Sequence, residues 1–356
     1  MNDRVKKLGT AIAGFADAAL IFSEVSRFYF TGFPATDGCL LVTPAEAVFY
    51  TDSRYTEAAE KKIGAQFVRD SKELYKDLAS FFADKKIGTV ALENDRLTLR
   101  QYEELCEKLP GISFCVTDAL SNAVEEIRIV KTESEVEKIV KAQRIAEKAF
   151  EHILNFIKPG KTEKEVRLEL EFYMLSHGAD DLSFETIAVA GVKTSMPHGV
   201  PGDNVIKSGD FVTMDYGALT DGYHSDMTRT VAVGDITDEQ RLVYATVLEA
   251  QKAGLAALTD GISGKDADKA ARDVIEKAGF GAYFGHGTGH GVGVEIHESP
   301  NLSPRSKHTL KAGHIVTVEP GIYLPGKFGV RIEDMALITP DGCIDLTECP
   351  KELTIL

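Results

Sequence analysis

The sequence predicts a two-domain α/β protein, in which a smaller mixed-sheet domain precedes a larger domain built from a duplicated unit. The chain has 356 residues, of which 44% are apolar and 27% charged, and this size and composition suit two ordinary globular domains. Short β-prone runs alternate with helical stretches in the first third, and a strand pattern recurs in the remainder. We therefore expect domains at residues 1–125 and 126–356.

The N-terminal domain is predicted from runs of β-prone residues that alternate with helical segments. The expected strands are residues 19–22, 39–42, 47–50, 89–92 and 112–116, and the expected helices are residues 72–82 and 99–108. This domain contains no histidine and no compact group of acids, so its sequence pattern assigns it no chemistry.

Long helices are expected in each half of the larger domain, and two of them begin at capping boxes. Thr132 is followed three residues later by Glu135, and Thr162 by Glu165. A threonine and a glutamate at this spacing satisfy each other's free backbone N–H groups at the start of a helix. The expected helices are residues 132–156, 162–177, 238–258 and 265–278.

Two strands of the larger domain share one pattern. Residues 207–215 and 311–319 have Lys, Gly, Val, Thr and a terminal acid in common, at an offset of 319 − 215 = 104 residues. Each half then supplies a further acid, Asp226 or Glu333. Such self-similarity indicates a duplicated unit, and a pseudo-twofold would bring four carboxylates to its axis. Chance agreement is the alternative, because Gly and Val are common in strands.

The two acids of the first half are expected on neighbouring strands. Residues 211–214, just before Asp215, form an apolar β-prone run, and residues 223–233, around Asp226, alternate as a second strand. A buried carboxylate is costly unless it is paired or binds a metal. A surface hairpin with two solvated acids is the alternative, and the duplication favours the metal site.

A glycine-rich segment with two histidines lies between the halves. Residues 285–293 contain five glycines, which exclude a stable helix and indicate a loop or strand end with close backbone approach. His286 and His290 lie within it, His297 follows it, and His198 lies after a proline in the first half. The segment fits neither Gly-x-Gly-x-x-Gly nor His-Glu-x-x-His, so a dinucleotide site and a single-zinc protease helix are both disfavoured.

The acids can be counted against divalent cations. Asp215, Asp226, Glu319 and Glu333 with one neutral histidine carry four negative charges, which balance two divalent ions. A pair of metal ions polarises a carbonyl and lowers the pKa of a shared water. Oxygen-rich ligation with one imidazole suits Mn²⁺, Co²⁺ or Zn²⁺, and the sequence does not choose among them.

Four ordered motifs, at residues 215–230, 285–293, 318–323 and 330–334, together resemble the proline-specific metallopeptidases of the pita-bread family, which includes creatinase, aminopeptidase P and prolidase. Residues 31–55 are similar to the N-terminal domain of the same family. The resemblance implies a creatinase-like N-terminal α/β domain and a duplicated pita-bread α+β catalytic domain with a curved antiparallel sheet.

The resemblance also implies the site residues. Five residues would be dinuclear metal ligands, with Asp226 and Glu333 bridging: Asp215, Asp226, His290, Glu319 and Glu333. Five would be catalytic, with Glu319 accepting a proton from the attacking water, His198 near the leaving proline, His286 lining the pocket, His297 donating to the carbonyl oxygen and Arg331 orienting this region. A plain salt bridge to Asp226 or Glu333 is the alternative role for Arg331, and Thr228 and Tyr223 are expected behind the ligands.

Two features depart from the family pattern or stay ambiguous. In the loop at residues 191–198, Lys193 and Thr194 stand where the family usually has Asn and Ser, which puts the hydrogen bonding of the pocket in question. Arg305 matches in position an arginine that holds a dipeptide carboxylate in prolidase-like enzymes, or it is a solvated loop charge.

The leading hypothesis is an Xaa-Pro aminopeptidase, a metal-dependent exopeptidase in which a hydroxide activated by two metal ions releases the first residue of peptides with a penultimate proline. The alternative is an Xaa-Pro dipeptidase (prolidase), which needs a free proline carboxylate. A catalytically inactive peptide-binding module of the same fold is a third reading, which the presence of all five ligand residues disfavours. Proline-containing peptides are the expected partners, and the resemblance implies a homodimer.

Charge and cysteine content constrain the setting. Lys plus Arg is 40 and Asp plus Glu is 55, so the formal charge of −15 disfavours nucleic acid and anionic membranes as partners. The five cysteines have no Cys-x-x-Cys spacing, and we expect free thiols in a reducing compartment. Without a signal-like start or a long apolar run, the sequence predicts a soluble cytoplasmic protein.

Overall fold

The computed structural model describes residues 2–356, and these form two compact units, one ending at Arg128 and the other covering Ile129–Leu356. The first unit is built on a six-stranded mixed sheet of order β4-β3-β2-β1-β5-β6. Its strands are β1 (Ala18–Ile21), β2 (Cys39–Val42), β3 (Ala47–Thr51), β4 (Val68–Asp70), β5 (Thr89–Leu92) and β6 (Ser113–Cys115). The helices of this part of the chain are α1 (Asp3–Ile12), α2 (Glu24–Thr31), α3 (Thr56–Ile63), α4 (Leu74–Lys85), α5 (Leu99–Lys108) and α6 (Ala119–Ile129).

The sheet of the first unit confirms the predicted mixed α/β class. Strands β1, β2 and β3 run antiparallel, whereas β5 and β6 extend the sheet in parallel from β1. All residues of β1, β2 and β3 are buried, since helices cover both faces of such a sheet. Helices α1, α2, α3 and α6 were not among the predicted elements.

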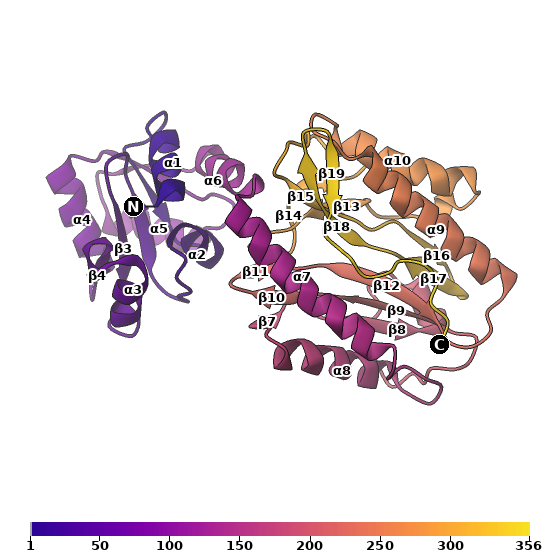
Figure 1. The fold of residues 1–356 in the computed structure, drawn as a ribbon. Coiled ribbons are helices and arrows are strands. Elements are labelled where there is room, and N and C mark those ends of the chain that lie inside the picture. The colour runs from indigo at the N-terminus through magenta and orange to yellow at the C-terminus, as the bar shows by residue number, and fades with distance from the viewer. Residues whose placement is uncertain (1) are drawn as a thin grey trace. The chain divides into compact units, whose positions relative to one another are not determined.

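The second unit contains four long helices that pack in two pairs: α7 (Glu133–Ile153) with α8 (Glu163–Ser176), and α9 (Asp238–Ala257) with α10 (Gly264–Lys277). Figure 1 shows the first pair along one side of the strands of this unit and the second pair along another. Both predicted capping boxes are present, and the backbone N–H groups of Thr132 and Thr162 each donate to the glutamate three residues later, at 2.8 Å.

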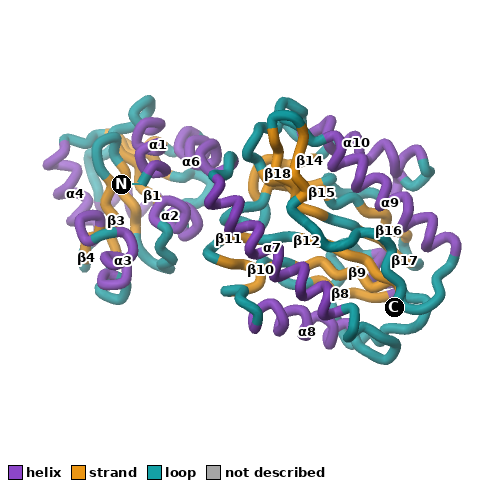
Figure 2. The backbone as a smooth tube through the Cα atoms, in the orientation of Figure 1, coloured by secondary structure: helices purple, strands orange, loops and turns teal. Residues whose placement is uncertain are grey.

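The named strands of the second unit pair antiparallel throughout, and Figure 2 shows them between the helix pairs. They form sheets of order β11-β10-β7, β12-β9-β8, β14-β13-β15-β18-β19 and β16-β17. Their bounds are β7 (Asp181–Leu182), β8 (Ile187–Ala190), β9 (Phe211–Tyr216), β10 (Ala218–Thr220), β11 (Tyr223–His224), β12 (Met227–Ala232), β13 (Gly289–Gly291), β14 (Glu298–Leu302), β15 (Ile315–Val318), β16 (Gly321–Leu324), β17 (Phe328–Arg331), β18 (Asp334–Thr339) and β19 (Gly342–Asp345).

The same construction occurs twice in this unit, as the sequence repeat predicted. Strand β9 ends around Asp215 and pairs with β12, and strand β15 ends just before Glu319 and pairs with β18. The halves meet where Thr228 forms a β-bridge to Glu333, with Glu333 N–H donating to the Thr228 carbonyl at 3.1 Å. The acid-bearing strand ends of both halves therefore face one region.

The strand predicted over residues 223–233 is interrupted at Ser225 and Asp226, between β11 and β12. At the break, Ser225 Oγ accepts a hydrogen bond from the Ala218 backbone N–H at 3.0 Å. A Cβ on Gly217 would lie 1.9 Å from the Ser225 carbonyl oxygen, so only glycine permits this close approach. The side-chain alternation of one continuous strand is broken here, and the periodicity could not show it.

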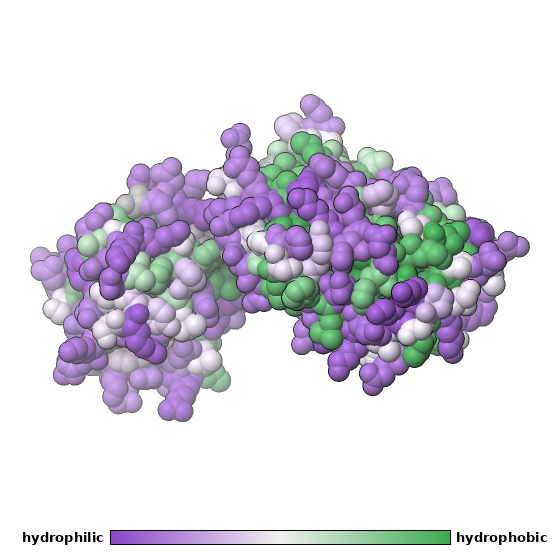
Figure 3. Space-filling model, turned by 60° about the horizontal axis from the view of Figure 1, so that its bottom comes forward, coloured by the Kyte–Doolittle hydropathy of each residue, from purple (hydrophilic) through white to green (hydrophobic). Residues whose placement is uncertain are grey.

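Most of the surface in Figure 3 is hydrophilic, as the high charge content predicts. The five cysteines are free thiols, in agreement with the sequence prediction. Within residues 2–356, every helix is too short or too polar to cross a lipid bilayer.

Candidate metal centre

The first acid lies near the end of a buried strand. Asp215 in β9 pairs on one side with Ile187 of β8 and on the other with Thr228 of β12, so the sheet fixes its backbone. Its Oδ2 accepts a hydrogen bond from Arg331 Nη2 at 2.6 Å. Its Oδ1 is buried and has no hydrogen-bond partner within the described residues. An orphaned carboxylate oxygen of this kind fits a site that a cation completes.

His290 lies in β13, where glycines on both sides let the backbone approach its neighbours. A Cβ on Gly289 would lie 1.9 Å from the Thr317 carbonyl oxygen, and one on Gly291 would lie 2.3 Å from that of Ser299. The close backbone approach expected of the glycine-rich segment is therefore confirmed. His290 Nδ1 lies 3.0 Å from the Gly291 carbonyl oxygen, so it is the donor, and Nε2 keeps its lone pair.

The acids of the second half end their strands in the same region. Glu319 follows β15, and its backbone N–H donates to the Thr288 carbonyl at 2.7 Å. Glu333 lies between β17 and β18 and accepts a hydrogen bond from Thr228 Oγ1 to Oε2 at 2.7 Å. Thr228 therefore contacts the predicted ligand Glu333 directly, which agrees with its expected place behind the ligands.

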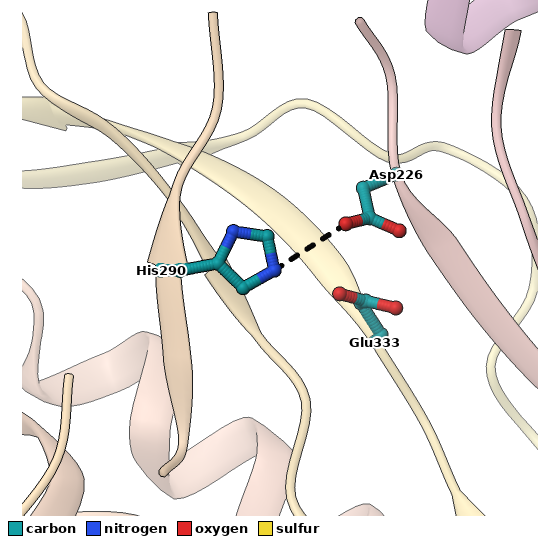
Figure 4. Close-up of side chains that lie close together, drawn as sticks. All are labelled: Asp226, His290 and Glu333. Carbon is teal, nitrogen blue, oxygen red and sulfur yellow. Dashed lines mark ion pairs between the residues drawn. The ribbon is translucent and has the colours of Figure 1, made fainter. Parts of the chain in front are cut away.

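Three of the five predicted ligands converge. Asp226, His290 and Glu333 each offer one ligand atom, and these atoms lie within 4.8 Å of one another. Figure 4 shows the three side chains pointing toward a common space from three different segments, with His290 Nε2 at 3.5 Å from Asp226 Oδ2. Glu319 borders the group, because its Oε1 lies 3.6 Å from His290 Nε2. Asp215 is turned toward Arg331 and is not part of the converging group.

The electrostatics of this cluster favour a bound cation. Burial raises the pKa of Asp226 and of Glu333 well above their ordinary values, and neighbouring carboxylates raise both further. Burial likewise raises the pKa of Glu319 to about 8. Desolvation lowers the pKa of His290 to about 4, so this imidazole is neutral near pH 7. A neutral imidazole beside crowded carboxylates is a donor set that suits Mn²⁺, Co²⁺ or Zn²⁺.

A cavity of about 480 Å³ contains the cluster. Its lining includes every predicted ligand and catalytic residue: His198, Asp215, Asp226, His286, His290, His297, Glu319, Arg331 and Glu333. Arg305 is exposed and does not line the cavity. Tyr223 is also outside the lining, and its hydroxyl donates to Glu135 at 3.1 Å. The expected place of Tyr223 behind the ligands stays a prediction.

Arg331 is buried and each of its guanidinium nitrogens has an acceptor in the protein. Nε donates to Thr228 Oγ1 at 3.1 Å, Nη1 to the Tyr323 hydroxyl at 2.9 Å, and Nη2 to Asp215. The Tyr323 hydroxyl lies 2.8 Å from His286 Nε2, and His286 Nδ1 lies 2.8 Å from the Gly287 carbonyl oxygen. The salt bridge that was the alternative role of Arg331 is thus present, but to Asp215 rather than to Asp226 or Glu333.

Both ring nitrogens of His286 are engaged in that chain. Burial lowers the pKa of His286 to about 4, so the ring is neutral, with Nδ1 as donor and Nε2 as acceptor from Tyr323. His198 and His297, in contrast, are exposed on the cavity wall. The His297 ring lies 4.4 Å from that of His290, measured between centroids. His198 and His297 are therefore the histidines that a ligand in the cavity can reach.

The loop that carries His198 has a hydrogen-bond pattern of its own. Lys193 Nζ donates to Glu163 Oε2 at 2.7 Å and to the Val200 carbonyl at 3.1 Å, so it joins both sides of the loop. Thr194 Oγ1 accepts the Gly329 N–H at 2.8 Å. Both residues that depart from the family pattern, Lys193 and Thr194, therefore make hydrogen bonds within the protein.

Sequence reasoning missed a clamp on the glycine-rich segment. Asp268 and Arg272, one turn apart on α10, form a salt bridge of 2.8 Å. Arg272 Nη2 donates to the His286 carbonyl at 2.7 Å, and Asp268 Oδ1 accepts from Thr288 N–H and Oγ1 at 3.0 and 2.9 Å. The only signal in the sequence was an acid and an arginine four residues apart, which is common on solvated helices.

Comparison with known proteins agrees with this geometry. Residues 137–340 match Metallopeptidase family M24, and residues 4–130 match the Creatinase/Prolidase N-terminal domain. An Xaa-Pro dipeptidase of Pyrococcus furiosus is 38% identical over 357 residues, which cover 99% of this chain and 100% of that protein.

Solved structures extend the likeness to three dimensions. An Xaa-Pro dipeptidase from Bacillus anthracis matches with a TM-score of 0.95 at 42% identity, covering 99% of both chains. An X-Pro aminopeptidase from Thermotoga maritima matches with a TM-score of 0.93 at 36% identity, covering 99% of this chain and 100% of that chain. The chain therefore belongs to metallopeptidase family M24 and has the two-domain pita-bread fold that its motifs predicted.

Proposed function

We propose that this protein is an Xaa-Pro dipeptidase, which hydrolyses the peptide bond before the proline of a dipeptide. The observation that best supports this proposal is the cluster of Asp226, His290 and Glu333, which Glu319 borders, inside a cavity of about 480 Å³. Several relatives are named Xaa-Pro dipeptidase, and they support dipeptidase activity over the aminopeptidase activity that was the leading hypothesis from the sequence. The likeness to an X-Pro aminopeptidase keeps the latter as the second candidate.

We assign metal binding to Asp215, Asp226, His290, Glu319 and Glu333, all in the domain at residues 126–356. Two divalent cations, Mn²⁺, Co²⁺ or Zn²⁺, would supply polarisation of the scissile carbonyl and a lowered pKa for water. The orphaned Oδ1 of Asp215 supports its inclusion, because a buried carboxylate oxygen lacking a donor needs a cation.

The chain's own residues then position and protonate the substrate. Bound cations would lower the raised pKa of Glu319, and its ionised carboxylate, which borders the cluster and lines the cavity, would accept the proton of the attacking water. His297 donates to the developing oxyanion, and His198 gives a proton to the departing proline nitrogen, because both rings are exposed in the cavity. Arg331 holds Asp215, and His286 holds Tyr323, so both position the site.

The test is hydrolysis by protein loaded separately with Mn²⁺, Co²⁺ or Zn²⁺. An Xaa-Pro dipeptide, an Xaa-Pro-Xaa tripeptide and an Xaa-Ala dipeptide are compared. We expect cleavage of the Xaa-Pro dipeptide alone. Cleavage of the tripeptide with at least equal efficiency would establish the aminopeptidase, and the absence of any cleavage would leave the inactive peptide-binding module.

A cytoplasmic homodimer remains part of the proposal on the strength of the family resemblance and the free thiols. Light scattering coupled to size exclusion measures the assembly state directly. A mass equal to one chain of 38.8 kDa would overturn the dimer.

A further inference from the structure

The strand that follows His297 has a register that its own pairing does little to specify. In the pairing of β14 with β13, Leu302 lies opposite Gly289 and Glu298 lies opposite Gly291, and the register shifts between these pairs. The sequence of β13 is Gly-His-Gly, so glycines stand where side chains would otherwise interlock with β14. Register is weakly specified in glycine-rich strands, and a slip of one residue turns every side chain to the opposite face. A contact outside the pairing is therefore needed to hold β14.

A buried ion pair supplies such a contact at the first residue of β14. Lys131 Nζ donates to Glu298 Oε1, and the two side chains are 1% and 6% exposed. Lys131 precedes Glu298 by 167 residues, so the pair joins β14 to a distant part of the chain. A buried charge that loses its partner is costly, so the pair opposes any slip of β14 that would separate the two groups.

Both members of the pair are held firmly. The Lys131 backbone N–H donates to the Gly313 carbonyl at 2.8 Å, and the next residue, Thr132, begins the capping box of α7. Around the other member, a Cβ on Gly293 would collide with the carboxylate of Glu298, so the backbone encloses that carboxylate closely. The ammonium of Lys131 is therefore a fixed point against which β14 is placed.

Glu298 and His297 are neighbours with opposite surroundings. The Glu298 side chain is buried against Lys131, whereas His297 is exposed and lines the cavity of the acid cluster. Consecutive side chains along a strand point to opposite faces, so holding Glu298 inward directs His297 toward the cavity. His290 has supports of its own, because its N–H donates to Thr317 Oγ1 at 3.1 Å and its strand also pairs with β15. The ion pair therefore acts on His297 in particular.

We propose that Lys131 is a positioning residue, which fixes the register of β14 through Glu298 and so holds His297 where it donates to the developing oxyanion. This inference rests on the proposed Xaa-Pro hydrolysis and names a residue outside the described cavity lining on which that reaction depends. A donor stabilises the oxyanion only when it lies at hydrogen-bond distance from the place where the charge develops, so a displaced His297 loses its effect.

The experiment removes both charges together, because a single substitution would leave an unpaired buried charge that destabilises the fold, whereas two apolar side chains of similar volume do not. In the double variant Lys131→Met/Glu298→Met, we expect kcat to fall by about 10- to 100-fold, which is the effect of a misplaced catalytic group. KM should change by less than about 2-fold, since the lost interaction forms only in the transition state. An unchanged kcat overturns the proposal.

The matched control is Lys252→Met/Glu352→Met, which removes a lysine–glutamate pair of 3.2 Å whose side chains are 53% and 66% exposed. It should leave kcat within about 2-fold, as expected of surface substitutions. A loss as large as that in the Lys131→Met/Glu298→Met variant would overturn the proposal, because the effect would then not be specific to β14.

The His297→Ala background separates positioning from general structural damage. Once the donor is absent, the double variant should lower kcat by less than about 2-fold further, because two changes that act through one group are not additive. A further loss equal to that in the unaltered protein shows that the ion pair acts elsewhere, and it overturns the assignment to His297.

Nuclear magnetic resonance of metal-free protein with isotope-labelled histidine separates this inference from the proposed function, because it requires no turnover. His297→Ala identifies the ring signal of His297. In the double variant this signal should shift or broaden, whereas the signals of His152 on α7 and His177 at the end of α8 should stay unchanged. If no Xaa-Pro bond is hydrolysed but the His297 signal changes, the proposed function fails while the positioning stands. An unchanged His297 signal overturns the inference.

Discussion

Glu333 and Asp334 are neighbours in sequence, both acidic and both buried, yet their surroundings are opposite. Asp334 Oδ1 accepts from Arg229 Nη2 at 2.7 Å, and Oδ2 accepts from Gln251 Nε2 at 2.7 Å and from Lys351 Nζ. Glu333 accepts from Thr228 and faces Asp226 and Glu319. Burial alone therefore does not mark a metal ligand, whereas burial among like charges does.

The largest effect is expected from a substitution of Asp334, the acid with charged partners. Asp334→Asn leaves the buried guanidinium of Arg229 without its counter-charge, whereas Lys351 keeps Asp345 at 2.8 Å, and we expect a loss of about 3–5 kcal/mol in the free energy of unfolding. Urea denaturation measures this loss. A change below about 1 kcal/mol, the value expected of an exposed pair, would show that the network contributes no more than a surface ion pair.

Glu333→Gln alters the acid that has no cationic partner, and it should lower catalytic activity rather than stability. Turnover should fall by more than about 100-fold, since replacing even the outer partners of metal ligands costs about 10- to 100-fold. Asp226→Asn should behave likewise, with the strand intact. Activity assays with metal analysis of the folded protein provide the measurement, and unchanged turnover would refute both ligand assignments.

The pH response of the metal-free protein sharpens the contrast. A carboxyl whose pKa is raised on folding is protonated in the folded state, so its stabilisation is lost as pH rises toward the folded pKa, about 8 for Glu319. The partly buried His286 and His290, whose pKa values are lowered to about 4 by desolvation, act oppositely, because the stability that they contribute is lost as pH falls below about 6.5. Between about pH 6.5 and 8, the acids alone therefore determine how the free energy of unfolding changes with pH.

We therefore expect the melting temperature of metal-free protein to fall across that window, and to fall less in Glu333→Gln, which removes one titrating acid. Saturation with Mn²⁺ should flatten the decline, because the cation competes with protons for the same oxygens. Calorimetric scans at several pH values measure it. A melting temperature that rises with pH in this window would contradict the raised pKa values.

The smallest effect is expected at Glu163, a buried acid that has both a lysine and backbone N–H groups as partners. Lys193→Met removes the cation from the buried Glu163, which keeps the backbone donors of Ala190 and Gly202, so stability should fall by about 1 kcal/mol. Because Lys193 also joins both sides of the loop carrying His198, kcat should fall more than KM changes. Arg at this position should restore part of kcat, and an unaltered kcat would show that the loop holds its shape without the clamp.

Local signals in the sequence were sufficient for much of the fold. The capping boxes at Thr132 and Thr162 predicted the starts of α7 and α8, because N-terminal capping involves residues only three apart. The repeat that ends in Asp215 and Glu319 predicted the duplicated strands, since each copy must bury the same face.

The remainder depended on contacts between distant residues. The hydroxyl of Tyr323 links Arg331 to His286, and no pattern in the sequence joins the three. The hydroxyl of Tyr223 donates to Glu135, 88 residues earlier in the sequence, and no pattern predicted that contact.

The loop after His198 offers a position for a fluorescent reporter of ligand binding. The Val200 side chain is 75% exposed and lines the cavity, and the chain contains no tryptophan. Val200→Trp would make a single indole the sole long-wavelength fluorophore, placed at the cavity and attached to the segment that Lys193 restrains. Excited at a wavelength that the 11 tyrosines do not absorb, its emission would report ligand entry in real time.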